Sequence, residues 1–150
     1  MRPNWLTKLL TAACVAGAFM AAPAAAKNLK FAYALSTSSH YGAGADAFVE
    51  TLEAELPGKF KVEQFPNSAL GGEREVLEGL QLGTIDLAIV STGATVNFVP
   101  ATGVFDIPFL FRDLDHARGV LDGEIGQKLL AEFNKRGLVG LAWGEQGFRQ

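Results

Sequence analysis

Short apolar runs alternate with longer amphipathic stretches along most of this chain. Three short segments rich in apolar and aromatic residues predict strands at Leu29–Leu35, Phe60–Phe65 and Ile85–Val90. Apolar residues at helical spacing predict helices over Tyr41–Leu56 and after Gly71-Gly72. Because strands that alternate with helices at this spacing usually pair in parallel, we expect an α/β sheet covered on both faces.

The second half of the chain continues this pattern. Two more helices are expected near Asp113–Leu121 and Glu124–Lys135, and Gly137 should end the second of them. The apolar run Leu138–Trp143 predicts another strand. The segment Phe105–Phe111 is so rich in aromatic residues that it belongs in a core or an interface, and the core is the simpler interpretation.

Residues 1–26 predict a cleaved export signal rather than part of the fold. Arg2 and Lys8 form a basic region, Leu9–Met20 is an apolar run too short to span a bilayer, and Ala24–Ala26 suits a cleavage site. The single cysteine, Cys14, lies inside this signal. Acylation of Cys14 is the alternative, but the residues before it match a lipoprotein signal poorly. Export without disulfides is typical of a bacterial periplasmic protein.

The charge of the mature chain excludes some partners. Removal of Arg2 and Lys8 with the signal leaves 11 basic and 16 acidic residues and a net charge of −5. A mildly acidic protein is a poor binder of nucleic acid or of anionic membranes. An anionic ligand would therefore have to meet a local positive feature.

Two motifs suggest enzymatic chemistry, and both are better explained without it. Gly42–Ala47 matches the dinucleotide fingerprint GxGxxA, but six residues separate it from the strand that the fingerprint must follow directly. Small residues that let the helix pack closely on the sheet explain it better. The loop Ser36–His40 contains serines and a histidine, but no GxSxG elbow accompanies them. The other histidine, His116, follows acidic residues at a helix start and is expected at the surface.

These motifs therefore predict no catalytic residue and no cofactor, and no metal site is predicted because no pair of histidines or cysteines is spaced for one. The polar loops instead suggest a small-molecule site. The carboxyl ends of parallel strands meet at one edge of a sheet, where open α/β folds bind ligands. The candidate ligand contacts at this edge are Ser36, Thr37, Ser38, His40, Glu73, Ser91, Thr92 and Arg149.

Most of these candidates also have a purely structural interpretation. The loop Ser36–His40 and the segment after Val90 could cap the helices that follow them. Gly71-Gly72 could offer free N–H groups to an anion or merely shape the loop. Glu73 could complement the helix dipole or accept a hydrogen bond from a ligand hydroxyl or amine. Arg149 could pair with a carboxylate, although its spacing alone fits an ordinary surface arginine better.

Taken together, four segments of this chain resemble the solute-binding proteins of tripartite ATP-independent periplasmic (TRAP) transporters, the C4-dicarboxylate-binding family. The resemblance covers Leu29–Gln150. The segments that carry it are Phe65-Pro66 with Leu70–Glu75, Leu80–Asp86, Pro108–Phe111 and Gly147–Arg149. Each segment is weak alone, but four in this order at family-like spacing are quite specific.

The resemblance implies a periplasmic-binding-protein-like clamp of two α/β domains. Residues 27–150 would form most of the first domain, and a C-terminal part would be missing. Such a protein is not an enzyme. It is periplasmic, is expected to be monomeric when complete, and delivers a small organic acid (a dicarboxylate, keto acid or sugar acid) to a TRAP-type permease.

The candidate contacts match positions that border the cleft of this family. The family's principal carboxylate-binding arginine lies further on, in the second domain, and Arg149 matches an earlier arginine that assists in some members. Two alternatives stay open from the sequence: an exported α/β hydrolase or oxidoreductase completed by residues beyond Gln150, and a ligand-sensing adaptor domain.

Overall fold

The computed structural model describes residues 26–147 and contains a parallel three-stranded sheet. The strands are β1 (Lys27–Tyr33), β2 (Phe60–Phe65) and β3 (Leu87–Ile89), in the order β2-β1-β3. The central strand pairs with β2 from Lys27–Phe60 to Ala32–Phe65 and with β3 from Phe31–Leu87 to Tyr33–Ile89. The predicted parallel sheet is therefore confirmed, although β3 is shorter than expected. The predicted export signal, apart from Ala26, and Arg149 lie outside the described residues.

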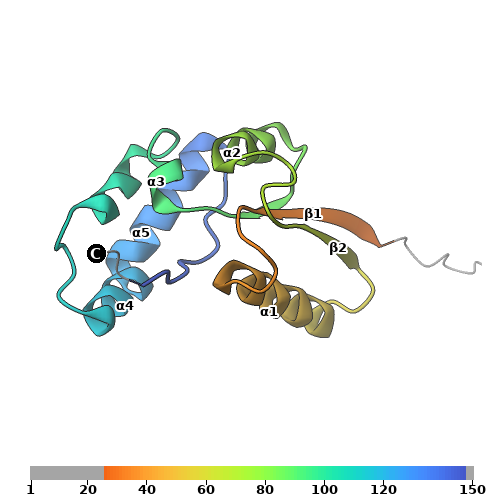
Figure 1. The fold of residues 1–150 in the computed structure, drawn as a ribbon, viewed down its shortest axis with the longest axis horizontal. Helices are drawn as coiled ribbons and strands as arrows, with labels where there is room; N and C mark the ends of the chain where they lie inside the picture. Colours follow the sequence, from red (N-terminus) through yellow and green to blue (C-terminus); the bar gives the residue numbers. More distant parts are fainter. Residues whose placement is uncertain (1–25, 148–150) are drawn as a thin grey trace, which may run out of the picture.

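The helices α1 (His40–Glu55) and α2 (Glu73–Leu82) cover opposite faces of the sheet (Figure 1). Successive side chains of a strand point to opposite faces, and β1 follows this rule. Phe31 and Tyr33 are buried against Ala45 of α1, whereas Ala32 is buried against Val76 of α2. The predicted covering of both faces is confirmed.

Small residues at the start of α1 allow the close packing that the sequence predicts. Ala45 is fully buried against the sheet. A Cβ atom on Gly42 would lie 2.0 Å from the carbonyl oxygen of Thr37, so only glycine fits there without a shift of the backbone. The motif Gly42–Ala47 is thus explained by packing.

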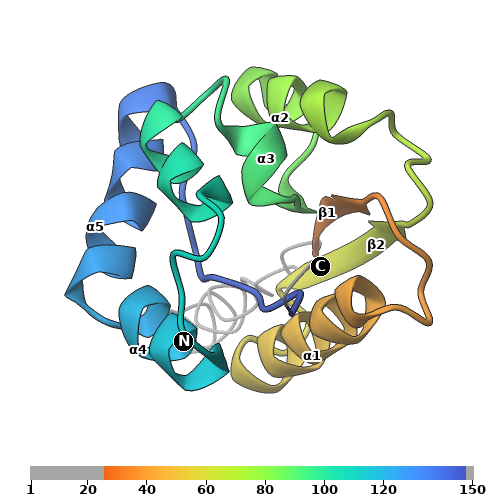
Figure 2. The ribbon, with the colours of Figure 1, turned by 60° about the vertical axis from the view of Figure 1, so that its left-hand side comes forward.

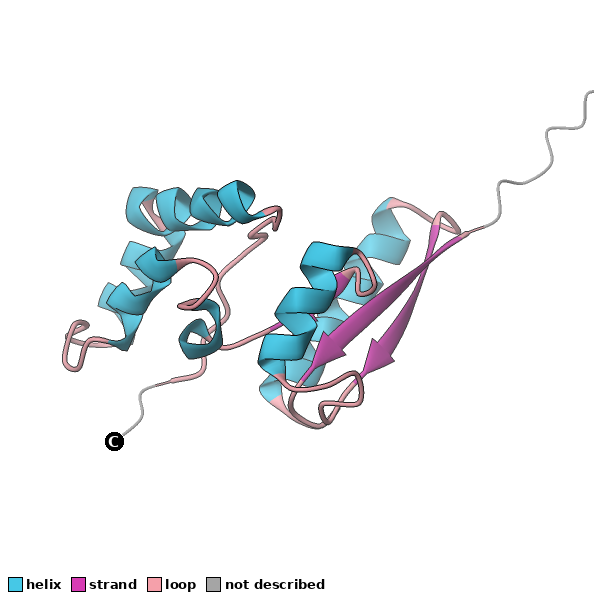
Figure 3. Cartoon of the chain, turned by 90° about the horizontal axis from the view of Figure 1, so that it is seen from above, coloured by secondary structure: helices cyan, strands magenta, loops and turns pink. Residues whose placement is uncertain are grey.

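The remaining helices follow β3 and gather to one side of the sheet (Figures 2 and 3). They are α3 (Thr92–Thr95), the 3₁₀ helix η1 (Pro100–Asp106), α4 (Leu114–Asp122), α5 (Glu124–Glu132) and the 3₁₀ helix η2 (Phe133–Arg136). The two predicted helices of this half are confirmed, and Gly137 ends η2 in a left-handed conformation with φ of 72°. A second apolar cluster joins α2 to this group through Leu77, Val99, Phe133 and Leu138.

The strand predicted at Leu138–Trp143 is not present. The segment alternates partly like a strand, with Leu138 buried and Val139 and Leu141 exposed by 72% and 65%. However, no described strand pairs with it, and a strand needs a neighbour for its backbone hydrogen bonds. Side chains hold it instead, since the indole of Trp143 donates to the carbonyl oxygen of Gly126 at 3.0 Å.

The prediction that Phe105–Phe111 is core holds for only part of that segment. Phe105 and Phe111 are half-buried and stack on each other, with ring centroids 6.1 Å apart. Ile107 is more than half exposed and Phe109 is fully exposed, so the prediction is wrong for these two residues. The chain turns after η1, where the backbone N–H of Leu110 donates a hydrogen bond to the carbonyl oxygen of Ile107. The side chains of Ile107 and Phe109 lie on the outside of this turn.

Within residues 26–147, every helix is too short or too polar to cross a membrane.

Candidate functional site

The loops that follow the three strands meet at one edge of the sheet, as expected for parallel strands. Backbone hydrogen bonds join the loop after β2 to the last residue of β1 and to the loop after β1. Asn67 donates to the carbonyl oxygen of Leu35 at 2.9 Å, and Ser68 donates to that of Tyr33 at 3.2 Å. Both Asn67 and Ser68 have φ of 55°, an uncommon conformation for residues other than glycine. This edge is therefore held by main-chain bonds rather than by side chains alone.

The loop Ser36–His40 combines a structural cap with exposed polar groups. The hydroxyl of Ser39 accepts a hydrogen bond from the backbone of Gly42 at 3.3 Å and donates to the carbonyl of Ser36 at 2.5 Å. The predicted helix cap is thus confirmed at Ser39. The candidates Ser36, Thr37, Ser38 and His40 remain exposed at the edge.

Glu73 and Ser91, which are 18 residues apart in the sequence, are in direct contact. One carboxylate oxygen of Glu73 accepts the backbone N–H of Ser91 at 2.8 Å, and the other accepts its hydroxyl at 2.6 Å. Hydrogen bonds to a carboxylate are shorter and stronger than those between neutral groups. Both residues are half-buried, and the contact fixes the start of α3 against the start of α2.

Asp106 adds a second carboxylate, which no sequence motif marks as a candidate contact. The hydroxyl of Thr92 donates to Asp106 at 3.2 Å, and the other oxygen of Asp106 lies 3.9 Å from the position of a Cβ atom on Gly93. A buried pair of hydroxyls positions this contact, because Thr95 of α3 and Thr102 of η1 lie 2.8 Å apart. No motif links these segments, so only the fold brings Asp106 to the edge.

The glycine pair before α2 serves loop geometry. Gly71 has φ of 108°, which side chains rarely adopt. The carboxylate of Glu75 turns back over the helix start and would meet a Cβ atom on Gly72 at 2.8 Å. Glu73 and Glu75 thus both lie in the first turn of α2, where negative charge is favourable. These observations favour the structural interpretation over an anion site.

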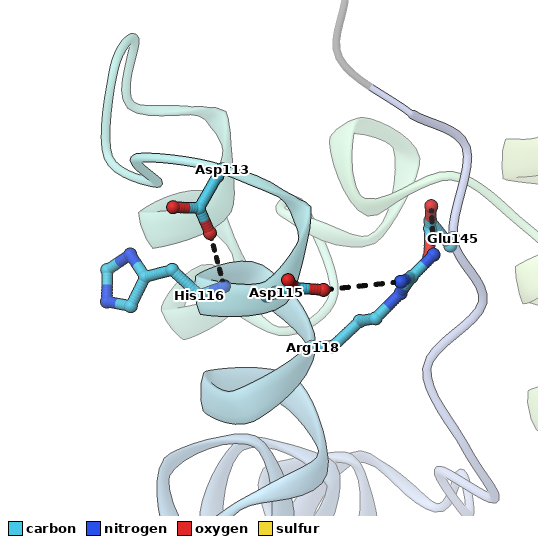
Figure 4. Close-up of polar contacts among 5 residues, drawn as sticks. All are labelled: Asp113, Asp115, His116, Arg118 and Glu145. Carbon is cyan, nitrogen blue, oxygen red and sulfur yellow. Dashed lines mark hydrogen bonds and ion pairs between the residues drawn. The ribbon is translucent and has the colours of Figure 1, made fainter.

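His116 lies at the start of α4, as predicted, and is half-buried (Figure 4). Its backbone N–H donates to Asp113 at 2.7 Å, which makes Asp113 the cap of α4. Its ring nitrogen Nδ1 accepts from the backbone of Arg112 at 3.3 Å, and its ring meets Phe111 edge to face. His116 belongs to a different part of the fold from the candidate edge.

A pocket of about 210 Å³ lies between α4 and the segment after Leu138, lined in part by Arg118, Trp143 and Glu145. Arg118 donates to the two carboxylate oxygens of Glu145 at 2.8 and 3.2 Å (Figure 4). The hydrogen bond with Glu145 and its negative charge raise the pKa of the Arg118 guanidinium above its ordinary value. None of the described candidate contacts lines this pocket, and the ion pair serves to attach the segment to α4.

Among the described residues, no group of three or more histidine, cysteine, aspartate or glutamate side chains is arranged to hold a metal ion.

The family model for the bacterial extracellular solute-binding proteins, family 7, matches residues 31–150. The chain belongs to this family. It is a family of binding proteins rather than of enzymes, and the α/β fold class predicted from the sequence is confirmed.

This chain matches individual members of the family over about 40% of their own length. A solute-binding protein from Verminephrobacter eiseniae is 47% identical over 129 residues, which are 86% of this chain and 38% of the relative. A TRAP periplasmic solute-binding protein from a Bordetella species is 74% identical with a TM-score of 0.80, over 81% of this chain and 40% of that one, and its structure contains density attributed to pantoate. One from a Polaromonas species, bound to D-erythronate, is 53% identical with a TM-score of 0.79 over the same shares.

Proposed function

We propose that this chain is part of a periplasmic solute-binding protein that captures a small organic acid and delivers it to a TRAP-type permease. The observation that supports this most directly is the 74% identity to a TRAP periplasmic solute-binding protein of the same fold. In this proposal residues 1–26 are a cleaved signal, and residues 27–150 form the N-terminal domain of a two-domain clamp. The complete protein is a monomer, and closure of the clamp couples ligand capture to docking on the permease.

The ligand would be a dicarboxylate, a keto acid or a sugar acid. Pantoate and D-erythronate, named for two similar structures, are the first compounds to test. Both are four-carbon-chain carboxylic acids with hydroxyl groups on carbons 2 and 4. The exposed hydroxyls of Ser36, Thr37 and Ser38 offer donors and acceptors that suit such a ligand.

The proposed site is a wall of a cleft. Ser36–His40, Glu73, Ser91 and Thr92 would border the ligand on this side, and Arg149 would pair with its carboxylate. Support for the wall comes from the contact between Glu73 and Ser91 and from the meeting of the loops at one edge.

A thermal-shift screen of the complete polypeptide that carries this chain tests the proposal. Pantoate, D-erythronate, C4-dicarboxylates, keto acids and hexonates are added in excess, and a binding acid should raise the melting temperature, because a ligand that binds only the native state stabilises it. Absence of a shift with every acid would contradict the proposed function.

Replacement of Arg149 by alanine should weaken ligand binding in the same polypeptide. A bidentate arginine–carboxylate pair is lost, so we expect at least a tenfold increase in Kd, or about 1.4 kcal/mol. Titration calorimetry measures this effect, and Arg74→Ala, on the exposed side of α2, serves as the control. An unchanged affinity would remove Arg149 from the site.

A further inference from the structure

Two carboxylates from distant parts of the chain meet two consecutive residues at the candidate edge. Glu73, at the start of α2, holds Ser91 through both of its oxygens, at 2.8 and 2.6 Å. Asp106, at the end of η1, accepts the hydroxyl of Thr92 at 3.2 Å. The edge at residues 91–92 is therefore negatively charged on two sides.

The loops that carry these charges supply no lysine or arginine to balance them. The segments 34–40, 66–72 and 90–106, which form the edge and the approach to Asp106, contain neither lysine nor arginine. Arg74 is adjacent to Glu73 in the sequence, but it is largely exposed and forms an ion pair with Glu78 at 3.1 Å. Lys59 and Lys61 lie at the amino end of β2, the opposite end of the sheet.

The side-chain donors at this point, and the backbone N–H of Ser91, are already in use. A ligand carboxylate only accepts hydrogen bonds, so it would need N–H or O–H donors. The backbone N–H and hydroxyl of Ser91 donate to Glu73, and the hydroxyl of Thr92 donates to Asp106. Each carboxylate oxygen accepts more than one hydrogen bond, so Glu73 and Asp106 still have acceptor capacity. The surface therefore complements a hydroxyl, which donates, and opposes a second carboxylate.

We propose that Glu73 and Asp106 are specificity-determining residues that select hydroxylated monocarboxylic acids over the corresponding dicarboxylic acids. The ligand turns its hydroxyl end toward Ser91 and Thr92, and its single carboxylate lies away from this wall. This inference rests on the proposed function and narrows its ligand class.

Matched ligand pairs test the selection directly. Meso-tartrate differs from D-erythronate only in a carboxylate that replaces the terminal hydroxymethyl group. In the same way, 3,3-dimethylmalate is pantoate with a carboxylate in place of its terminal hydroxymethyl group. In titration calorimetry with the complete polypeptide, the Kd of each diacid should exceed that of its monoacid by about 100-fold. Added salt should reduce this ratio, because salt screens the repulsion between exposed charges.

Neutral variants of Glu73 and Asp106 test whether these two residues cause the selection against dicarboxylic acids. Glu73→Gln keeps both contacts with Ser91, since its amide oxygen accepts the N–H and its amide nitrogen donates to the hydroxyl. Asp106→Asn likewise keeps an acceptor for Thr92, and because Asp106 is exposed this variant carries little risk to folding. Each variant should reduce the diacid-to-monoacid ratio of Kd by about tenfold. Glu50→Gln, on the exposed side of α1, removes the same charge and should leave the ratio unchanged.

The outcomes separate this inference from the proposed function. If no acid binds the wild-type polypeptide, the proposed function fails, and the inference fails with it. If a diacid binds as tightly as its monoacid, the inference is overturned while the proposed function stands. If the ratio persists in Asp106→Asn and in a folded Glu73→Gln, the assignment to these residues is overturned.

Discussion

At the scale of single residues, two contacts shape the candidate site: Glu73 with Ser91, 18 residues apart, and Asp106 with Thr92, 14 residues apart. A glycine pair before Glu73 and a buried strand before Ser91 and Thr92 mark these residues in the sequence, and the fold brings Glu73 and Ser91 into contact. Sequence spacing does not predict that Glu73 contacts Ser91, because this contact depends on how α2 packs against the strand that precedes Ser91. Asp106 was missed for the same reason, since its contact with Thr92 spans 14 residues and two short helices.

Gly42 and Gly44 lie in the same helix and should respond in opposite ways to alanine. A Cβ atom on Gly42 would lie 2.0 Å from the Thr37 carbonyl oxygen, so Gly42→Ala should lower the free energy of unfolding by about 1–3 kcal/mol. The nearest atom to a Cβ atom on Gly44 would be Ile89 Cδ1 at 3.8 Å. Gly44→Ala should therefore raise the free energy of unfolding by about 0.5–1 kcal/mol, because alanine has the better helix propensity. Urea denaturation measures both changes. Equal changes in the free energy of unfolding would contradict the close approach of Gly42 to the Thr37 carbonyl.

Tyr33 should make stability depend on pH in the alkaline range. Burial, with a further contribution from the charge of Asp46, raises the pKa of its phenol above 10.0. The unfolded chain therefore loses this proton at lower pH than the folded chain does. The stabilisation is fully present below about pH 10 and is lost as the pH rises through the raised folded pKa.

Tyr33→Phe isolates this effect. The variant loses the hydrogen bond from Tyr33 to Gln64, which is 2.6 Å long, and should be less stable by about 1 kcal/mol at neutral pH. The difference in free energy of unfolding between wild type and variant should shrink as the pH rises above 10. A difference that stays constant through the alkaline range would show that the phenol has an ordinary pKa.

At the scale of elements, the sequence predicted structure well wherever a segment carries its own signal. The bounds of β2 are those expected from its alternating pattern, and α1 and α2 follow from apolar spacing and flanking turns. The helices α3 and η1 are too short to show a periodic pattern. The strand expected at Leu138–Trp143 failed because a strand depends on a neighbour, which the segment's own residues do not specify.

The cap of α4 gives a test at this scale. Asp113 accepts the backbone N–H of His116, so Asp113→Ala should destabilise the protein by about 1 kcal/mol. Asp115→Ala removes an exposed ion pair with Arg118 at 3.5 Å and a negative charge from the first turn of α4, and should cost less, about 0.5 kcal/mol. Chemical denaturation distinguishes the two, and equal losses would mean that the cap contributes nothing specific.

At the scale of the whole molecule, large apolar side chains are exposed in the described part of the chain. Phe109 is fully exposed, Ile107 is more than half exposed, and Val139 and Leu141 are exposed along an unpaired segment. Exposed apolar groups of this size promote association or are covered by other parts of a protein.

The turn after η1 should therefore bind hydrophobic dyes when residues 27–150 are studied alone. Replacement of both Ile107 and Phe109 by serine should reduce the fluorescence of the dye 8-anilinonaphthalene-1-sulfonate by about half or more, because the replaced side chains are the most apolar part of this turn. Leu82→Ser, at the end of α2, is the control, since it removes one exposed apolar side chain elsewhere. Equal fluorescence of the double variant and wild type would show that the dye binds elsewhere.

The main-chain hydrogen bonds from Asn67 and Ser68 to the end of β1 and the loop after it determine how the proposed site would tolerate mutation. Because backbone atoms join these loops, the side chains of Ser36, Thr37 and Ser38 are not needed to join one loop to the other. If this edge binds the ligand as proposed, mutations at these positions alter the ligand contacts without dismantling the edge itself. A library randomised at these three positions should therefore consist largely of folded proteins.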